Sequence, residues 1–320
     1  MTEIARLTHV SQPTVSRVLN GNSKVSPEIR ERVLACAREH DYQFNALAKA
    51  LQGSKTGLLG VLVTDISNGF FADLTKQIEI AARKSGYSII LFNSDYNPQS
   101  EREYLDVVRR YRVDGVLAVP TRETSPQWRE YIKKLDVPVV TITRHATGLD
   151  SVYVDHAAAG GMVAQHLIDQ GFGRFLFIGK DYDEKYVGFR RTLSERGLGP
   201  QTTNMVLHSH AQLKQDLGDW FHSAQTRAGI FAGNDIYALQ VLDILRELGV
   251  SVPEQAGVMG FDDTFMGRHL NPRLSSVSQP TDQMAQEAVA WLLKRMESPE
   301  EPKEPLNRAF SAKLVIREST

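Results

Sequence analysis

Two spacings of hydrophobic residues alternate along most of the chain, starting at residue 58. Short apolar runs, typical of buried strands, are each followed by a segment whose apolar residues recur every three or four positions, typical of an amphipathic helix. The strand-like runs cover 58–63, 88–92, 115–119, 137–142, 174–179, 229–233 and 257–261, and the helical segments cover 71–85, 99–111, 126–135, 157–170, 185–196 and 235–248. This order predicts doubly wound parallel sheets with helices on both faces. Because so many units exceed what one hydrophobic core usually holds, we expect two lobes with a ligand site between them.

The beginning of the chain has a different pattern, with short helices and polar connections. We expect a brief helix over 2–7, a second from Ser11 with Pro13 in its first turn, and a third after Ser26 and Pro27. The connection between the first two is only about three residues long, which is typical of a helix-turn-helix. The second helix would turn polar side chains outward, as a helix in the major groove of DNA does.

A fourth short helical segment covers residues 45–53, with an Asn at its start and a Gly at its end. A helix of this length is not stable by itself in water, so a partner must fold it. Residues 53–57 indicate a linker between this segment and the strand at 58.

Composition limits the class of protein. The 320 residues are 42% hydrophobic and 23% charged, as in ordinary folded domains. No apolar run is long enough to span a membrane, and the N-terminus has no apolar signal segment. The single cysteine, Cys36, excludes an internal disulfide and a cysteine-based metal site. We therefore expect a cytoplasmic protein with no membrane partner.

Charge and motifs favour binding over catalysis. Residues 1–55 contain eight Lys and Arg against five Asp and Glu, a modest positive excess in a chain whose net charge is −1. The common phosphate-binding, nucleophile and zinc motifs are missing from the sequence. We expect His208 and His210 to be solvated and His156 to lie near a crossover between the lobes. The expectation is no enzyme, no cofactor and no metal ion, and an α/β enzyme with an accessory DNA-binding segment is the alternative.

Several motifs in one order give a resemblance that covers nearly the whole chain. They are EIA (3–5), VSQPTVSRVLN (10–20), KVSPEIRERV (24–33), the segment 42–51, DISNGFF (65–71), VDG (113–115), FAGNDIYAL (231–239), VPE (252–254), GFDD (260–263) and LSSVSQP (274–280). With these motifs the chain resembles the lactose/galactose repressor (LacI/GalR) family of bacterial transcription regulators. The resemblance implies an N-terminal all-α helix-turn-helix headpiece and a two-lobed α/β core like that of periplasmic binding proteins.

The resemblance assigns the DNA contacts to the second helix. It implies a major-groove set of Gln12, Pro13, Ser16 and Arg17 and a phosphate-contacting set of Thr14, Asn20 and Ser26. Gln can pair with adenine and Arg with guanine, whereas Pro offers only an apolar contact. The family usually has Gly where this chain has His9 and Pro where it has Phe44, which puts the local geometry of both places in question. An ordinary surface helix of a small bundle is the alternative.

The resemblance also implies that residues 45–52 form a hinge helix when two subunits dock in the minor groove. Leu51 would be the wedge between base steps, Lys49 a nearby cation and Asn45 the cap. A linker helix packed on the core is the alternative.

The positions of the family's ligand site carry polar and aromatic residues in this chain. They are Phe70, Phe71, Arg144, Lys185, Asp235, Asp262 and Gln279. Charged and amide groups with aromatic faces suit a polyhydroxylated ligand, because each hydroxyl needs a donor and an acceptor. Lys185 replaces the family's common Arg, so a planar bidentate contact is lost. Each of these residues could instead serve a salt bridge or a loop cap.

These inferences combine into one hypothesis. We expect a DNA-binding domain at 1–44, a hinge helix and linker at 45–57, and a core at 58–320. Lobe 1 would contain 58–155 and 281–305, and lobe 2 would contain 156–280 and 306–320. The protein would be a homodimeric repressor, with region 71–85 in the dimer interface, that binds a pseudo-palindromic operator in double-stranded DNA under the control of a small-molecule effector such as a sugar. A solute-binding module without a regulatory role and a purine- or nucleoside-responsive regulator are the alternatives.

Overall fold

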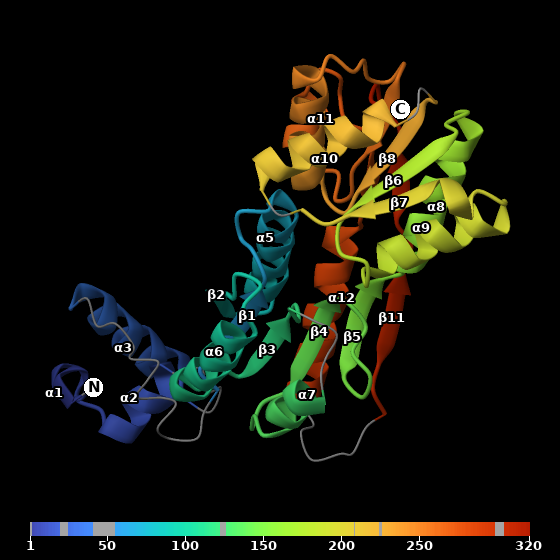
Figure 1. The fold of residues 1–320 in the computed structure, drawn as a ribbon. Helices are drawn as coiled ribbons and strands as arrows, with labels where there is room; N and C mark the ends of the chain where they lie inside the picture. Colours follow the sequence, from blue (N-terminus) through green and yellow to red (C-terminus); the bar gives the residue numbers. More distant parts are fainter. Residues whose placement is uncertain are drawn as a thin grey trace. The chain divides into compact units, whose positions relative to one another are not determined.

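The computed structural model describes residues 2–19, 25–40, 55–121, 126–207, 209–223, 226–297 and 304–320. The chain divides into two compact units, Met1–Thr56 and Gly57–Thr320 (Figure 1). The smaller unit is helical, and the larger one contains the sheets. The expected helical headpiece and two-lobed α/β core are both confirmed.

The smaller unit has three described helices, α1 (Thr2–Thr8), α2 (Gln12–Leu19) and α3 (Pro27–Glu39). Their apolar faces meet in a small core that contains Ile4, Val15, Val18, Val33 and Ala37. The side chain of Ser26 caps α3 by accepting a hydrogen bond from the backbone N–H of Ile29, with Pro27 in the first turn. The local cap and breaker signals therefore place these helices as predicted.

The turn between α1 and α2 contains a residue in the left-handed region. His9 has a φ of 52°, and the next backbone N–H, that of Val10, donates to the carbonyl of Ala5 at 3.2 Å. This hydrogen bond closes the end of α1 and requires the chain to reverse sharply at residue 9. The backbone conformation that suits Gly at this turn is thus held here by a histidine.

Lobe 1 of the larger unit is built on a six-stranded parallel sheet with the order β11-β5-β4-β3-β1-β2. Its strands are β1 (Leu58–Val63), β2 (Ser88–Asn93), β3 (Gly115–Ala118), β4 (Val139–Thr143), β5 (Asp150–Val154) and β11 (Asn307–Phe310). The helices of this lobe are α5 (Gly69–Lys84), α6 (Pro98–Tyr111), α7 (Pro126–Lys133) and α12 (Thr281–Glu297). A half-buried ion pair between Arg295 and Asp150, with an N–O distance of 2.7 Å, joins α12 to β5. Helix α12 therefore belongs to this lobe although it follows lobe 2 in the sequence.

Lobe 2 has a four-stranded parallel sheet with the order β7-β6-β8-β9. Its strands are β6 (Arg174–Ile178), β7 (Thr202–Met205), β8 (Ala228–Ala232) and β9 (Ala256–Met259). Its helices are α8 (His156–Asp169), α9 (Glu184–Glu195), α10 (His210–His222) and α11 (Asp235–Glu247), with the short 3-10 helices η1 (Gly199–Gln201) and η2 (Met266–His269). Phenylalanines on β6, β8 and α9 fill the centre of this lobe.

The chain passes between the lobes three times. It leaves lobe 1 after β5, returns before α12, and leaves again after β11, which is hydrogen-bonded to β5. Next to the last two passages, β10 (Ser276–Ser278) pairs antiparallel with β12 (Lys313–Val315). The expected assignment of residues 306–320 to lobe 2 is therefore wrong for β11, because this strand completes the edge of the lobe 1 sheet.

Helices α8 and α9 approach each other at backbone distance. A Cβ atom added to Gly188 would lie 1.8 Å from the carbonyl oxygen of Ala157, and one added to Gly160 would lie 2.0 Å from that of Lys185. Only glycine permits this contact, which joins the first turns of both helices. It fixes the position of the residues that begin α8 and α9.

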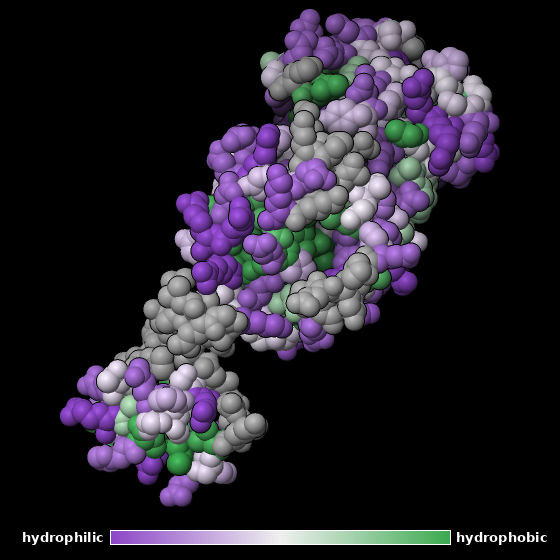
Figure 2. All heavy atoms as spheres, turned by 90° about the horizontal axis from the view of Figure 1, so that it is seen from below, coloured by the Kyte–Doolittle hydropathy of each residue, from purple (hydrophilic) through white to green (hydrophobic). Residues whose placement is uncertain are grey.

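The surface of the core is mixed in character. Hydrophilic residues dominate the face shown in Figure 2, and hydrophobic residues are visible in separate areas. Among the described helices, none combines the length and the apolar character needed to cross a membrane.

Candidate functional site

A cavity of about 290 Å³ lies in the core at the carboxyl ends of strands from both sheets. Six of the seven residues expected in a ligand site line it: Phe70, Phe71, Arg144, Lys185, Asp262 and Gln279. They come from loops and helix starts of both lobes. A molecule in this cavity would touch both lobes at once.

Three helices begin at the wall of the cavity, each with its first turn capped by a side chain. Asn68 accepts a hydrogen bond from the N–H of Phe70, Asp183 from that of Lys185, and Asn234 from that of Tyr237. All three capping residues line the cavity. The helix starts therefore present a polar wall and a positive end of each helix dipole to a bound molecule.

The loops around the cavity have an unusual backbone. Five of the seven described non-glycine residues with positive φ lie after strands at this edge: Asp95, Tyr96, Thr143, Asp262 and Asp263. Thr143, with a φ of 78°, is β-branched and so a genuine outlier. Strain of this kind is typical of functional sites, where the surrounding structure imposes it.

Asp262 holds the centre of the polar wall. Its carboxylate accepts a hydrogen bond from the amide of Gln279 at 2.8 Å and from the amide of Asn68, on the other lobe, at 3.5 Å. Burial raises the pKa of Asp262 to about 7, although Lys185 acts in the opposite direction. The Oε1 atom of Gln279 and the Oγ1 atom of Thr64 are buried in the cavity wall without a hydrogen-bond partner. Both atoms can accept a hydrogen bond from a ligand hydroxyl.

Lys185 is held firmly in the second lobe. Its ammonium group donates to the carbonyl of Gly233 at 2.6 Å, lies 3.5 Å from a carboxylate oxygen of Asp183, and sits over the ring of Phe261 at 4.5 Å. Burial acts against ionisation of Asp183, but the charge of Lys185 outweighs it and lowers the pKa of that carboxyl. The guanidinium of Arg144, in contrast, has no hydrogen-bond or ion-pair partner among the described residues. Arg144 is thus the cation available to a ligand.

His156 is a cavity residue that the sequence analysis left outside the site. It begins α8 at the crossover between the lobes, as expected, but it also lines the cavity. Its Nδ1 atom lies 3.6 Å from a carboxylate oxygen of Glu184, and its ring meets Phe261 edge-on at 5.5 Å. Burial lowers the pKa of His156, and the hydrogen bond from His156 lowers the pKa of Glu184. The position directly after a strand end was the signal that could have found it.

Three tyrosines of the cavity wall, Tyr96, Tyr182 and Tyr237, were also missed. Each lies in a loop or first turn that follows a strand. Tyr96 and Tyr182 are 46% and 58% exposed. Burial of the Tyr96 hydroxyl raises its pKa to about 12, so its ring spans from solvent to the interior of the cavity.

Asp235 was expected in the site, and the structure places it behind the wall. It is 1% exposed and is not a lining residue. Its carboxylate accepts hydrogen bonds from the N–H and hydroxyl of Thr264, at 2.6 and 2.9 Å, and from the hydroxyl of Ser276 at 2.6 Å. Asp235 therefore anchors the loop that carries Asp262, and this anchoring leaves it no free oxygen for a ligand.

Helix α2 presents the residues expected to contact DNA. Gln12, Pro13 and Arg17 are exposed, whereas Val15 and Val18 face the core of the smaller unit. Thr14 and Ser16 are half-buried on the same helix, and the hydroxyl of Thr14 lies 2.8 Å from that of Ser11. The role of Ser26 in capping α3 leaves its phosphate contact a prediction. The other predicted positions, Asn20, Asn45, Lys49 and Leu51, and the substituted Phe44, lie outside the described residues.

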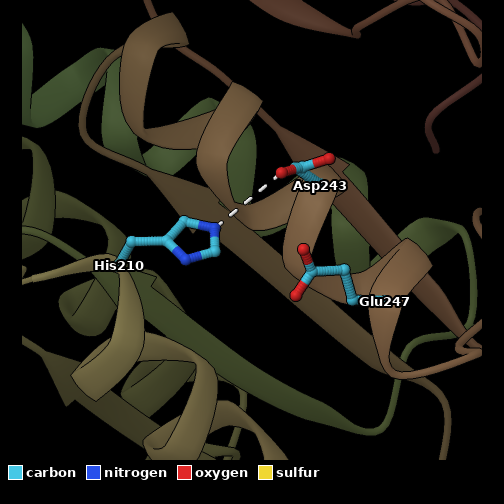
Figure 3. Close-up of side chains that lie close together, drawn as sticks. All are labelled: His210, Asp243 and Glu247. Carbon is cyan, nitrogen blue, oxygen red and sulfur yellow. Dashed lines mark ion pairs between the residues drawn. The ribbon is translucent and has the colours of Figure 1, made fainter.

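A second cluster of titratable groups lies on the surface of lobe 2 (Figure 3). His210 of α10 faces Asp243 and Glu247 of α11, with 3.8 Å between the ring Nε2 of His210 and a carboxylate oxygen of Asp243. Each carboxylate already has a cation, since Asp243 pairs with Arg246 and Glu247 with Lys214. These pairs make the cluster a surface ion-pair network. His208 lies outside the described residues.

A helix-turn-helix unit joined to a two-lobed core with a polar cavity defines a class, that of ligand-controlled DNA-binding regulators. Two family models match the chain: "Bacterial regulatory proteins, lacI family" over residues 1–45 and "Periplasmic binding protein-like domain" over residues 164–320. The chain belongs to the LacI family, and it is a DNA-binding transcriptional regulator and not an enzyme.

Named relatives support this membership over nearly the full length. The sucrose operon repressor of Pediococcus pentosaceus is 32% identical over 93% of this chain and 92% of its own. The structure of a LacI family regulator from Enterococcus faecium with bound ribose is 26% identical, with a TM-score of 0.71 over 82% of this chain and 98% of its own. A transcriptional regulator CelR–cellobiose complex is 25% identical, with a TM-score of 0.72 over 99% and 98%.

Proposed function

We propose that the protein is a repressor whose affinity for DNA is controlled by a sugar bound in the cavity of the core. The unpaired acceptors of Gln279 and Thr64, beside the carboxylate of Asp262, carry this proposal. Hydroxyl groups are the donors that would satisfy these atoms without bringing a charge into a buried site. The names of the relatives, which refer to sucrose, ribose and cellobiose, favour the same class of ligand.

A purine or nucleoside remains the second candidate because of the aromatic rings in the wall. Phe70 and Phe71 meet edge-on at 5.1 Å, so their faces are inclined to each other and form a corner and not a parallel slot for a planar base. A sugar ring, which is thicker and carries polar groups on its edge, fits such a corner better.

We further propose that α2 reads the base edges of a pseudo-palindromic operator in double-stranded DNA. Arg17 and Gln12 have the donors and acceptors that distinguish guanine and adenine, and Pro13 supplies an apolar contact. The segment with Asn45, Lys49 and Leu51 would be the hinge that enters the minor groove, and Thr14, Asn20 and Ser26 would contact phosphates. Since bacterial DNA lies in the cytoplasm, the protein would act there.

The proposed assembly is a homodimer. Phe265 and Met266, at 74% and 64%, are the most exposed large hydrophobic side chains among the described residues. On lobe 1 a groove of about 280 Å³ between α5 and α12 is lined by Ile80, Val289 and Leu293 among others. Burial of such side chains against a second copy is favourable by about 1.5–3 kcal/mol each. This supports the predicted place of α5 in the interface and adds Phe265 and Met266 to it.

Ligand and DNA would communicate through the lobes. Because the cavity wall comes from both lobes, a bound sugar would favour one angle between them, and this angle would set the spacing of the two hinge segments in a dimer. The effect of the ligand on DNA affinity must then equal the effect of DNA on ligand affinity.

The test combines two measurements on the full chain. A thermal-shift screen with sugars, sugar phosphates, nucleosides and purines should give an increase in melting temperature with a sugar, because a ligand that binds the native state stabilises it by mass action. The same sugar should change the affinity for operator DNA in a mobility-shift titration at fixed salt. Gln279→Glu should abolish the thermal shift. A shift with purines alone, or a sugar that binds without any effect on DNA affinity, would refute the proposal.

A further inference from the structure

The cavity has a polar interior and an aromatic mouth, and the two parts differ in what they can bind. Asp262, Gln279 and Thr64 lie in the interior, where hydrogen-bond acceptors are buried. Tyr182 lies at the mouth on lobe 2, in the loop between β6 and α9, and 58% of it is exposed. Its side chain has no hydrogen-bond partner among the described residues, so neither the ring nor the hydroxyl is engaged in holding the fold.

The mouth continues onto the opposite lobe. Tyr96 follows β2 of lobe 1, its hydroxyl is buried toward the interior, and its ring is 46% exposed. On the other side of the Tyr182 ring, the ammonium of Lys180 lies 5.6 Å from the ring centroid. One face of Tyr182 is thus covered by a cation, while the residue as a whole borders the cavity.

The size of the cavity exceeds one sugar ring. Its volume of about 290 Å³ would hold about ten water molecules at their density in the liquid. A single hexose has about twelve non-hydrogen atoms, and covalent bonds pack these atoms far more closely than separate waters, so one ring leaves part of the space unfilled. The remaining space includes the side next to the tyrosines of the mouth.

We propose that the ligand of this protein has two sugar rings, with the first in the polar interior and the second stacked on Tyr182 at the mouth. This inference rests on the proposed control by a sugar and narrows it to disaccharides and similar glycosides. The apolar face of a pyranose ring packs on the aromatic ring, and the hydroxyls at its edge remain in water or reach Lys180. Tyr182 would then determine specificity for the length of the ligand.

The experiment measures dissociation constants by calorimetry on the full chain for glucose, galactose, fructose, maltose, cellobiose, trehalose, sucrose and lactose. At least one disaccharide should bind more tightly than each of its component monosaccharides. Tyr182→Ala should reduce this ratio of affinities by about two- to tenfold, the range expected for loss of one ring-stacking contact. Tyr182→Phe should preserve the ratio because it keeps the ring.

Tyr111→Ala provides the matched control, since Tyr111 is a similarly exposed tyrosine at the end of α6 and away from the cavity. This variant should leave every affinity unchanged. Monosaccharides that bind as tightly as their disaccharides would overturn the two-ring proposal alone. A Tyr182→Ala variant with an unchanged ratio would do the same. If none of the eight sugars binds, the proposed control by a sugar fails as well.

Discussion

Replacement of Asp262 by Asn tests whether the carboxylate at the centre of the cavity opposes folding. The substitution removes the charge and keeps a side chain of nearly the same shape. Asn also tolerates positive φ better than most residues, which matters at a position with a φ of 110°. The change is therefore close to a deletion of charge alone.

The magnitude and its sign follow from the pKa. Burial raises the pKa of Asp262 from 3.8 to about 7, so the folded protein keeps this proton over a range of pH in which the unfolded chain has lost it. The penalty is absent below about pH 4, grows as the pH rises, and is complete above about pH 7. The full shift corresponds to about 4 kcal/mol. Because the carboxylate borders an open cavity, we expect about half of this, about 2 kcal/mol.

The assay is urea unfolding of the ligand-free full chain at pH 5, 6, 7 and 8, for the parent protein and the Asp262→Asn variant. The advantage of the variant over the parent should increase with pH and level off near pH 8. Loss of one acceptor for Gln279 or Asn68 is a cost that does not depend on pH, so the change of the difference with pH is the relevant quantity. Asp136→Asn, at an exposed carboxyl in lobe 1, is the control for removal of a surface charge.

Two results would refute this reasoning. One is a stability difference between variant and parent that is the same at pH 5 and pH 8. The other is an advantage that shrinks as the pH rises, which would mean that the folded state stabilises the ionised carboxylate. In either case the amides of Gln279 and Asn68 would compensate fully for the lost hydration.

Three further predictions concern other parts of the chain. Arg17→Ala should weaken specific DNA binding by about 1–3 kcal/mol at fixed salt and leave non-specific binding nearly unchanged, and equal loss on both DNAs in a mobility-shift assay would contradict a base contact. His9→Gly should stabilise the smaller unit by about 1 kcal/mol by relieving a φ of 52°, as measured by amide exchange of α1 and α2, and faster exchange would exclude this strain. Gly188→Ala should cost about 3 kcal/mol or more, because its Cβ would lie 1.8 Å from the carbonyl oxygen of Ala157, whereas Gly218→Ala, with its nearest neighbour at 3.9 Å, should be neutral or slightly stabilising in thermal unfolding.

The parts of the fold that could be predicted from the sequence are those with a strong local pattern. Helices α1, α2 and α3 have cap and proline signals, and the buried strands of both lobes are short apolar runs between helices. Strands β7 and β11 were missed because their residues are half-buried or exposed and lack an apolar run. Pairing of β11 with β5 joins residues more than 150 positions apart, and no local pattern encodes such a contact.

The site was predictable in position and less so in detail. The family motifs placed six residues at the cavity, since residues after strand ends share one edge of a parallel sheet. Asp235 was misplaced because the first turn of a helix can face either the cavity or the loops behind it, and only the contacts with Thr264 and Ser276 decide this. Tyr182 and His156 were missed because a single aromatic residue in a loop has no periodicity.

The pairing of β10 with β12 has a mechanical consequence. Two of the three passages between the lobes are hydrogen-bonded to each other at the point where they leave lobe 2, so these strands must move as one ribbon. A ribbon of this kind bends easily across its plane and resists shear within it. The lobes therefore have one soft degree of freedom, a rotation, and sliding is stiff. Any torque that a ligand exerts in the cavity is delivered along that single axis.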